Sequence, residues 1–338
     1  MSSSALLDLP GAVDGTGVDA GVAWHYGDPM REQRALAESV GFVDRGNRGV
    51  LLVPGEDRGA WLHSLTTQHL EHLAAGTATE ALVLSPTGRV EHHAQLADVD
   101  SVTWLDLEPG DAGPLLGYFD SMRFWSKVDP ADASADYSVL SVVGPETARA
   151  LSAIGVGTPA AGTAIALPGG GIVRGMAWPG PAAADVIVPR GSAGDIVTAL
   201  TGAGVVTAGL WAFEALRVEA RRPRLGFETD HRTIPHEVGW IGVAVHLDKG
   251  CYRGQETVAR VHNLGKPPRR LVLLHLDGSS EMLPGHGTPV ESGGRAVGFV
   301  GTAVHHHDLG PIALALVKRQ VPDDADLSVG SLVAAIDR

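Results

Sequence analysis

The residues with the clearest chemical potential lie at 249–256, where the chain reads KGCYRGQE and holds its single cysteine. Gly250 and Gly254 allow backbone conformations that a Cβ atom forbids, and they let neighbouring groups come close. The residues after Gly254 are typical of a short helix, so Cys251 is expected just before a helix N-terminus, where unpaired N–H groups stabilise an anion. Lys249 adds a positive charge nearby. Together these features predict a cysteine that can act as a thiolate.

From the sequence alone, a second interpretation of Cys251 stays open. Free cysteine is among the most buried residue types and often fills a small apolar space. A lone cysteine therefore does not by itself indicate chemistry. The residue types around it are compatible both with a reactive thiol and with a buried structural thiol.

Histidine is the other abundant chemical group, with 15 copies in the sequence. Three of them stand in a row at 305–307, which raises the question of a metal site. Adjacent residues of a strand point to opposite faces, and no cysteine or carboxylate stands nearby at a metal-ligand spacing, so we interpret them as surface histidines. One cysteine also cannot hold an iron–sulfur cluster alone, since such clusters need several protein ligands. No stably bound metal is expected.

The pattern of predicted helices and strands indicates an α+β fold. Residues 28–41 carry an aspartate N-cap, a proline at the first helical position and a glycine stop, which predict a helix. The run GVLLVPG predicts a strand closed by a Pro-Gly turn, and EDRGAWLHSLTTQHL predicts a helix after it. Two further strands are expected on either side of residues 85–88. The clearest helix of the chain is GLWAFEALRVEARRPRLG.

Composition divides the chain into three parts. Residues 1–25 are rich in glycine, serine, aspartate and alanine, and they are predicted to form a flexible N-terminal extension. Residues 26–266 contain the helices and strands described above, arranged as two α+β modules. Residues 267–338 begin with a Pro-Pro pair and consist of short strands separated by glycine, proline and aspartate. This last part is predicted to be a small separate β-domain.

Charge and composition exclude several classes of protein. The net charge is −13, and an acidic protein gains no general attraction to phosphate backbones, so direct binding to nucleic acid is not expected. No stretch approaches roughly 18 uninterrupted apolar residues, so no membrane span is expected. The N-terminus lacks the basic and apolar regions of a signal peptide, and a single cysteine excludes an intramolecular disulfide framework. We therefore expect a cytoplasmic protein in a reducing compartment.

The motif at 249–256 resembles the signature of the YgfZ family of folate-binding iron–sulfur cluster assembly and repair proteins. These proteins are related in fold to the glycine-cleavage T-protein, an aminomethyltransferase. Two more segments carry the resemblance: DRGNRGVLLVPGEDRGAWLHSLTTQHL is similar to the T-protein-like opening, and LRVEARRPRLGFETDHRTIPHEVGW to the segment that leads to the cysteine motif. The resemblance extends from about Tyr26 to the end of the chain. It implies a T-protein-like fold, with mixed sheet and helix modules around a central channel and a small C-terminal β-barrel-like domain.

The resemblance also implies tetrahydrofolate, or a related folate, as the cofactor. Glu219 matches the glutamate that binds the pteridine, whose N3–H and 2-amino group form a donor pair that one carboxylate can accept. Arg217 is a weaker candidate for contact with the same ligand. The residue types alone also allow Glu219 to be a solvated carboxylate that balances Arg221 and Arg222.

The same resemblance makes Cys251 and Lys249 the candidates for chemistry. The other residues of the motif are expected to support these two: Gly250, Tyr252, Gly254, Gln255 and Glu256. T-proteins carry an aspartate pair after a glycine-containing hairpin, and here His92 and His93 occupy that position as weak candidates for the folate site. Histidine can act as a general base near neutral pH, but it does not replace a fixed anion that stabilises a developing cation. This departure weakens the prediction of aminomethyl transfer.

The expected function is that of a tetrahydrofolate-binding accessory protein for the assembly or repair of iron–sulfur enzymes. Its expected partners are folate and, transiently, iron–sulfur client enzymes or assembly factors. An indirect effect on tRNA modification is expected through such clients, without contact with nucleic acid or a membrane. The alternative is a folate-dependent aminomethyltransferase or demethylase of the T-protein type. If the chain is an enzyme, this one-carbon transfer is the activity we expect.

Overall fold

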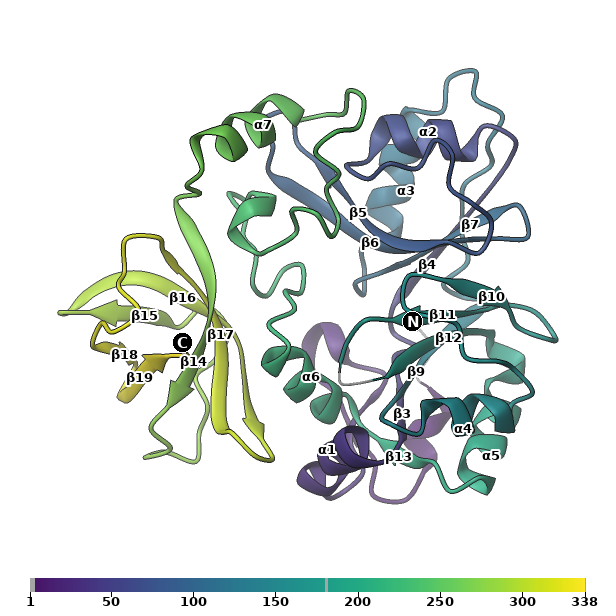
Figure 1. Ribbon diagram of the computed structural model, residues 1–338. Coiled ribbons are helices and arrows are strands. Elements are labelled where there is room, and N and C mark those ends of the chain that lie inside the picture. The colour runs from purple at the N-terminus through teal and green to yellow at the C-terminus, as the bar shows by residue number, and fades with distance from the viewer. Residues whose placement is uncertain (1–3, 180–181, 338) are drawn as a thin grey trace. The chain divides into compact units, whose positions relative to one another are not determined.

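The computed structural model describes residues 4–179 and 182–337, and the chain divides into two compact units. The first unit comprises Met1–Ser64, His69–Ala81 and Ala94–Phe213. The second comprises Leu65–Gln68, Leu82–His93 and Glu214–Arg338. Figure 1 labels the helices and strands of both units. The predicted fold class, an α+β fold of mixed sheets and helices with a C-terminal β-domain, is confirmed.

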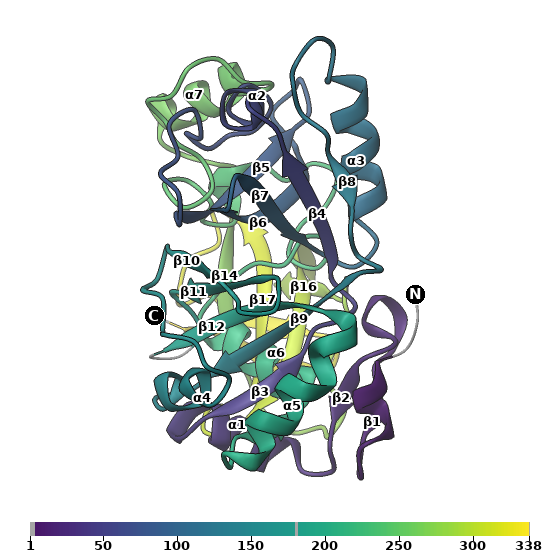
Figure 2. The ribbon, with the colours of Figure 1, turned by 90° about the vertical axis from the view of Figure 1, so that its right-hand side faces the viewer.

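A six-stranded sheet forms the centre of the first unit, in the order β10-β11-β12-β9-β3-β13. Its strands are β3 (Gly41–Asp44), β9 (Tyr137–Val143), β10 (Ala164–Ala166), β11 (Ile172–Met176), β12 (Ala183–Pro189) and β13 (Val206–Ala208). Only the pair of β13 and β3 is parallel among these neighbours. Side chains alternate along a strand, so Leu140 and Val142 lie on one face of β9 and Val139 on the other. The first face packs against α4 (Thr147–Ala153) and α5 (Ala193–Gly202), as Figure 2 shows.

The opposite face of this sheet packs against a five-stranded antiparallel sheet with the order β5-β6-β7-β4-β8. Its strands are β4 (Gly49–Pro54), β5 (Ala78–Leu84), β6 (Val90–Val99), β7 (Val102–Leu107) and β8 (Ala131–Asp132). Val50 and Trp104 of this sheet share an apolar cluster with Val139 and Ile187 of the other. The accompanying helices are α2 (Arg58–Leu65) and α3 (Ala112–Ser121), and α3 lies beside β4 and β8 (Figure 2).

The C-terminal strands close into a barrel in the order β14-β17-β16-β15-β18-β19. Their bounds are β14 (Arg269–Leu276), β15 (Pro289–Ser292), β16 (Arg295–His306), β17 (Gly310–Lys318), β18 (Leu327–Val329) and β19 (Leu332–Ile336). Leu274 and Ala315 belong to the main cluster of the barrel, while Leu273 and Val304 form another cluster with Val218 of α6 (Leu210–Glu219). The end of α6 is therefore packed on the barrel wall.

Residues 4–25 are structured, and the prediction of a flexible extension is wrong for them. They contain the 3-10 helices η1 (Ala5–Asp8) and η2 (Gly17–Asp19) and a small sheet of β1 (Val13–Asp14) and β2 (Ala23–His25). Leu6 of η1 lies in the apolar cluster that covers β3 and β9. A polar, glycine-rich composition indicates looseness only where no apolar side chain anchors the segment, and Leu6 provides that anchor. Residues 1–3 lie outside the described part of the chain.

Local sequence signals explain the remaining helices. α1 (Pro29–Glu38) begins where it was predicted, with the side chain of Asp28 accepting a hydrogen bond from the backbone of Arg31 at 2.9 Å. Two short 3-10 helices are η3 (Arg190–Ser192) and η4 (Pro235–Glu237).

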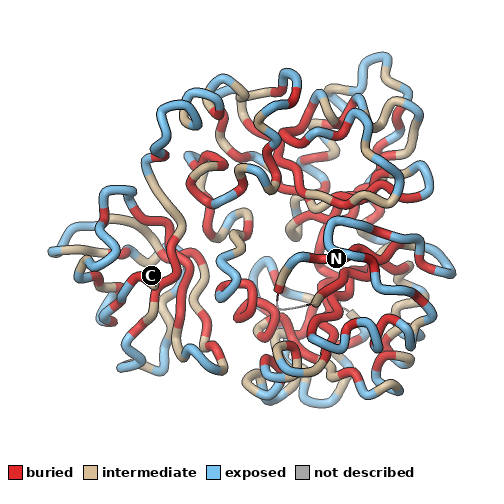
Figure 3. The backbone as a smooth tube through the Cα atoms, viewed as in Figure 1, coloured by how far each residue is buried: buried red, intermediate tan, exposed pale blue. Residues whose placement is uncertain are grey.

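Figure 3 shows that buried residues follow the strands of each unit, whereas loop tips are exposed. Across 4–179 and 182–337, no helix has both the length and the apolar character that a membrane crossing requires.

Candidate functional site

The KGCYRGQE segment belongs to the second unit and leads directly into α7 (Gln255–Leu264). The predicted helix is confirmed, and Gly265 ends it in the left-handed conformation, with a φ of 75°. Cys251 is exposed in the turn before this helix. The interpretation of Cys251 as a buried structural thiol is therefore wrong.

Two glycines pack this turn against the hairpin between β5 and β6. Gly254 has a φ of +81°, and a Cβ atom on it would lie 2.6 Å from the carbonyl oxygen of Ser85 and 2.8 Å from Cα of Gly88. A Cβ atom on Gly88 would lie 2.7 Å from Cβ of Thr257. Gly254 packs on backbone and Gly88 on the side chain of Thr257, so neither glycine accepts a side chain without displacement. The predicted close approach at Gly254 is confirmed, and its partner is the tip of the hairpin.

Lys249 is buried, with 5% of its surface exposed. Its Nζ donates a hydrogen bond to the carbonyl oxygen of Thr66 at 2.6 Å and lies 5.0 Å from the centre of the Tyr252 ring. Burial lowers the pKa of Lys249 to about 8, because removal from water disfavours the charged ammonium. A lysine that can release its proton this close to neutral pH has the property expected of a functional lysine. Assistance from Lys249 to the thiolate of Cys251 stays a prediction.

The residues after α2 fix the chain that leads to Lys249. Thr67 donates a hydrogen bond from Oγ1 to the carbonyl oxygen of Ala244 at 2.6 Å. The carbonyl oxygen of Thr67 accepts a hydrogen bond from the backbone N–H of His246 at 2.9 Å. Thr67 and Ala244 are 177 positions apart, so no local pattern in the sequence could have paired them.

His92 and His93 are adjacent residues of β6 and therefore lie on opposite faces of the strand. His93 is buried, and its ring stacks on the buried Trp240 with a centroid separation of 4.8 Å. The preceding carboxylate, Glu91, forms an ion pair with Arg253 at 3.1 Å. The two histidines thus do not present their side chains to one ligand together.

Glu219 is the last residue of α6, and its side chain is 48% exposed. Its Oε2 lies 3.3 Å from Nε2 of His306, at the end of β16. Its Oε1 accepts no hydrogen bond from the residues that the structure describes. The carboxylate can therefore accept an external donor, as the predicted pterin contact requires.

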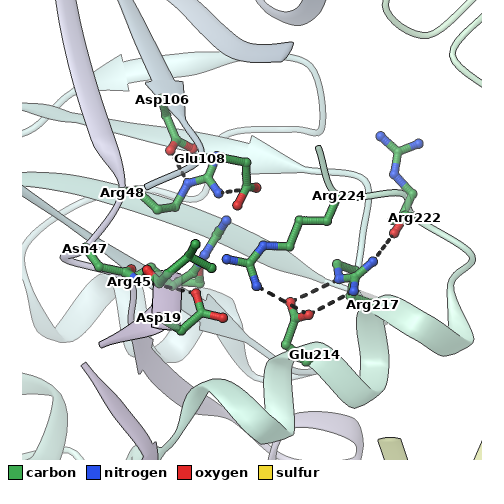
Figure 4. A network of polar contacts seen from close by, with 12 residues as sticks. Asp19, Arg45, Asn47, Arg48, Asp106, Glu108, Glu214, Arg217, Arg222 and Arg224 are labelled. Carbon is green, nitrogen blue, oxygen red and sulfur yellow. Dashed lines mark hydrogen bonds and ion pairs between the residues drawn. The ribbon is translucent and has the colours of Figure 1, made fainter. Parts of the chain in front are cut away.

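Arg217 is fully engaged by the protein, and its prediction as a weak folate contact is wrong. A guanidinium has five N–H donors, and here all five are used. The acceptors are Glu214 at 3.0 and 2.8 Å, Glu228 at 3.1 Å, Thr302 at 2.7 Å and the carbonyl oxygen of Arg222 at 2.5 Å. Figure 4 shows Arg217 bonded to Glu214 and Arg222. The side chain fastens α6 to the chain that follows it and to the barrel.

The three consecutive histidines are not all at the surface. His306 is buried, with 4% exposed, and the interpretation as surface histidines is wrong for this residue. His305 and His307 are half-buried. The alternation of side chains along β16 explains the difference, because the middle residue of the three points inward. In the part of the chain that the structure describes, no three histidine, cysteine, aspartate or glutamate side chains are grouped to hold a metal ion.

Comparison with known families gives two matches along the chain. The GCVT N-terminal domain matches residues 21–249, and the glycine cleavage T-protein C-terminal barrel domain matches residues 269–334. The chain belongs to the glycine cleavage T-protein family. The predicted T-protein-like fold is confirmed, whereas the narrower assignment to the YgfZ family stays a prediction.

Individual T-protein relatives are similar over most of their length. The aminomethyltransferase of Synechococcus elongatus is 30% identical over 290 residues, which cover 80% of this chain and 75% of the relative. The aminomethyltransferase of Streptomyces avermitilis is 25% identical over 338 residues, covering 92% of this chain and 86% of the relative. The crystal structure of the glycine cleavage system aminomethyltransferase T from Bartonella henselae superposes with a TM-score of 0.88 at 17% identity, covering 98% and 94% of the two chains. This last similarity concerns the fold alone.

The first unit of this T-protein family member contains a buried charge network that the sequence analysis missed. Arg48 pairs with Asp106, and with Glu108 at 2.8 Å, as Figure 4 shows. Arg174 pairs with Asp106 at 2.7 Å and also with Asp185. Burial opposes these charges, but Asp106 and Glu108 raise the pKa of Arg48 above its usual range. The network joins the two sheets of the unit, since Asp106 lies on β7 and Asp185 on β12.

A cavity of about 430 Å³ also lies in the first unit, with Arg48, Ser134 and Arg190 among its lining residues. Arg190 donates from Nη2 to the carbonyl oxygens of Gly46 at 2.6 Å and Ser134 at 2.9 Å. Both arginines are thus bonded to acceptors of the protein itself.

Proposed function

We propose that this T-protein family member binds tetrahydrofolate, with Glu219 as the ligand of the pterin. The observation that carries the proposal is the carboxylate at the end of α6, which is half-exposed and has Oε1 open to a donor. The pterin N3–H and 2-amino group form a donor pair that such a carboxylate accepts. Family membership supports the proposal, because the T-protein resemblance is what implies a folate ligand.

Thermal unfolding with and without tetrahydrofolate tests this proposal. A ligand at 100 times its Kd stabilises a folded protein by roughly 2.7 kcal/mol, so the midpoint should rise. In Glu219→Gln the new amide presents a donor to the donor pair, and we expect a loss of roughly 1–3 kcal/mol of binding free energy. Glu56→Gln is the matched control, because Glu56 is 79% exposed and lies outside the motif. If tetrahydrofolate raised the unfolding midpoint equally in wild type, Glu219→Gln and the control, Glu219 would not be the ligand.

For the role of the bound folate, we propose an accessory function in the assembly or repair of iron–sulfur enzymes. The exposed Cys251 supports this role, because another protein can reach its thiol. The buried Lys249 supports it as well, since a lysine of lowered pKa is a feature of functional sites. His92 and His93 stand where T-proteins carry their aspartate pair. Clients would bind transiently, because one cysteine does not supply the ligands of a cluster.

Complementation of iron–sulfur enzyme activity in cells that lack this protein tests the accessory role. We expect Cys251→Ala and Lys249→Met to fail and Arg260→Gln to succeed, because Arg260 is 69% exposed and outside the motif. Full activity with Cys251→Ala would contradict a role for the thiol. The protein level of each variant is the control for folding.

Folate-dependent aminomethyl transfer is a second candidate, and the comparisons favour it over the accessory role. The relatives from Synechococcus and Streptomyces are both named aminomethyltransferases. In this chain His92 would have to act as the base, since the position holds no carboxylate. Incubation with tetrahydrofolate and an aminomethylated carrier protein decides between the two. Formation of methylenetetrahydrofolate that is lost in His92→Ala supports transfer, and its absence supports the accessory role.

A further inference from the structure

His306 is a buried polar residue in contact with the proposed pterin ligand. It lies at the end of β16, and its Nε2 is 3.3 Å from Oε2 of Glu219. Nε2 itself is buried and makes no regular hydrogen bond among the described residues, and the carboxylate of Glu219 is the polar group that the structure places beside it. A buried N–H that faces a half-exposed carboxylate restricts the positions that this carboxylate can take.

The backbone around His306 fixes the tautomer of its ring. The N–H groups of Asp308 and Leu309 donate to Nδ1, at 3.2 and 3.1 Å. Nδ1 therefore carries the lone pair, and the proton of the neutral ring is on Nε2. Burial lowers the pKa of His306, Glu219 opposes that shift and His307 adds to it. The ring is thus a neutral donor toward Glu219 near pH 7.

The distance between His306 and Glu219 is set by packing between α6 and the barrel. Val218, next to Glu219, shares an apolar cluster with Val304, two positions before His306. Arg217 donates to Oγ1 of Thr302, also on β16, at 2.7 Å. These contacts hold the end of α6 and the end of β16 together without help from the Glu219 side chain.

We propose that His306 is the positioning residue of Glu219. The neutral imidazole interacts through Nε2–H with Oε2 and leaves Oε1 turned outward to receive the donor pair of the pterin. The carboxylate otherwise stands at a helix C-terminus, where the helix dipole disfavours an anion and nothing else on its own helix orients it. This inference rests on the proposed folate-binding function. It adds that His306, the buried member of the three consecutive histidines, belongs to the ligand site.

A double-mutant cycle on tetrahydrofolate binding tests the inference. The Kd is measured for wild type, His306→Phe, Glu219→Gln and the double variant. We expect His306→Phe to raise the Kd about 5-fold to 10-fold, as for loss of one orienting polar contact. In the Glu219→Gln background the same change should have almost no further effect, because the two residues act as a unit. Additive effects would overturn the proposal, since they indicate a general structural role.

Two more variants distinguish positioning from packing. His306→Gln places an amide N–H near the position of Nε2 and should bring the Kd to within about 3-fold of wild type. His305→Phe changes the neighbouring half-buried histidine, which contacts the carbonyl oxygen of Glu281, and should leave the Kd unchanged. A Kd in His306→Phe equal to wild type refutes the inference while leaving the function intact. If the wild-type protein does not bind tetrahydrofolate, both the inference on His306 and the proposed function are refuted.

Discussion

Two of the cations that the second unit buries, Arg217 and Lys249, lie in different environments, and the contrast separates a structural charge from a candidate for function. Arg217 has an acceptor for each of its five donors, and despite burial Glu214 and Glu228 raise its pKa. Lys249 is also buried, but its ammonium contacts a carbonyl oxygen and a ring face, and burial lowers its pKa to about 8. The fold stabilises the charge of Arg217 and disfavours that of Lys249. A residue retained against stability is a better candidate for function.

Removing the structural cation should have the largest effect on stability. Arg217→Met leaves the carboxylates of Glu214 and Glu228 buried without their main partner, and we expect a loss of about 3–5 kcal/mol. Urea unfolding followed by circular dichroism measures it. Arg260→Met is the control, because its ion pair with Glu256 is exposed at both ends and should contribute less than about 1 kcal/mol. Similar losses in the two variants would contradict the assignment of Arg217 to the fold.

A second variant tests whether the turn at Cys251 depends on its contact with the hairpin. Gly254→Ala adds a Cβ atom 2.6 Å from a backbone oxygen and also strains a positive φ, so we expect a loss of about 2–4 kcal/mol. Gly265→Ala is matched to it, with a φ of +75° but nothing within 4 Å of the new Cβ, and should lose about 1 kcal/mol. The difference between the two unfolding free energies isolates the packing contribution. Equal losses would show that the hairpin does not constrain the turn.

Lys249→Met should leave the free energy of unfolding unchanged or raise it by about 1–2 kcal/mol, while the proposed accessory role predicts that complementation fails. The folded-state pKa of Lys249 is about 8, below its ordinary value of 10.5. Between those pH values the unfolded chain binds more protons than the folded one, so the free energy of unfolding of wild type rises with pH. Lys249→Met should lack this rise. Thermal melts at pH 7.5, 9 and 10.5 compare the two proteins, and a parallel rise in both would exclude Lys249 as its source.

The smallest effect is expected for the surface pair beside the motif. Arg253 and Glu91 are 3.1 Å apart and each is about one-third exposed, so Arg253→Gln should lose no more than about 1 kcal/mol. The loss should shrink further in 1 M salt, where exposed charges are screened. A larger loss of stability that does not depend on salt would show that this pair is structural, as the ion pairs of Arg217 are.

Features that depend on neighbouring residues could be predicted from the sequence, and those that depend on distant residues could not. α7 followed from local signals, as did the barrel strands and the need for glycine at 254. Thr66 lies 183 positions from Lys249, and no local pattern connects them. For the same reason the pairing of Glu219 with His306 was missed, although alternation along β16 already implied that one of three adjacent histidines faces inward.

Two errors share one physical cause. The N-terminal residues were interpreted as loose from their polar composition, yet Leu6, Val22 and Ala23 are buried and anchor them. Arg217 was considered a weaker candidate for ligand contact from the family resemblance, yet its acceptors come from α6, the following loop and the barrel. Composition describes what a side chain can do, and only the surrounding fold decides whether that capacity is already used.

The second unit is assembled from three separate stretches of the chain, and this has a consequence during synthesis. The residues of the first unit are all made once Phe213 has left the ribosome, whereas the second unit still waits for its barrel. Contacts between residues far apart in sequence form slowly, and domains tend to fold as units while the chain emerges. The surroundings of Cys251 are therefore completed among the last parts of the nascent protein. A chain released early would contain every residue of the first unit and lack the surroundings that the proposed role of Cys251 requires.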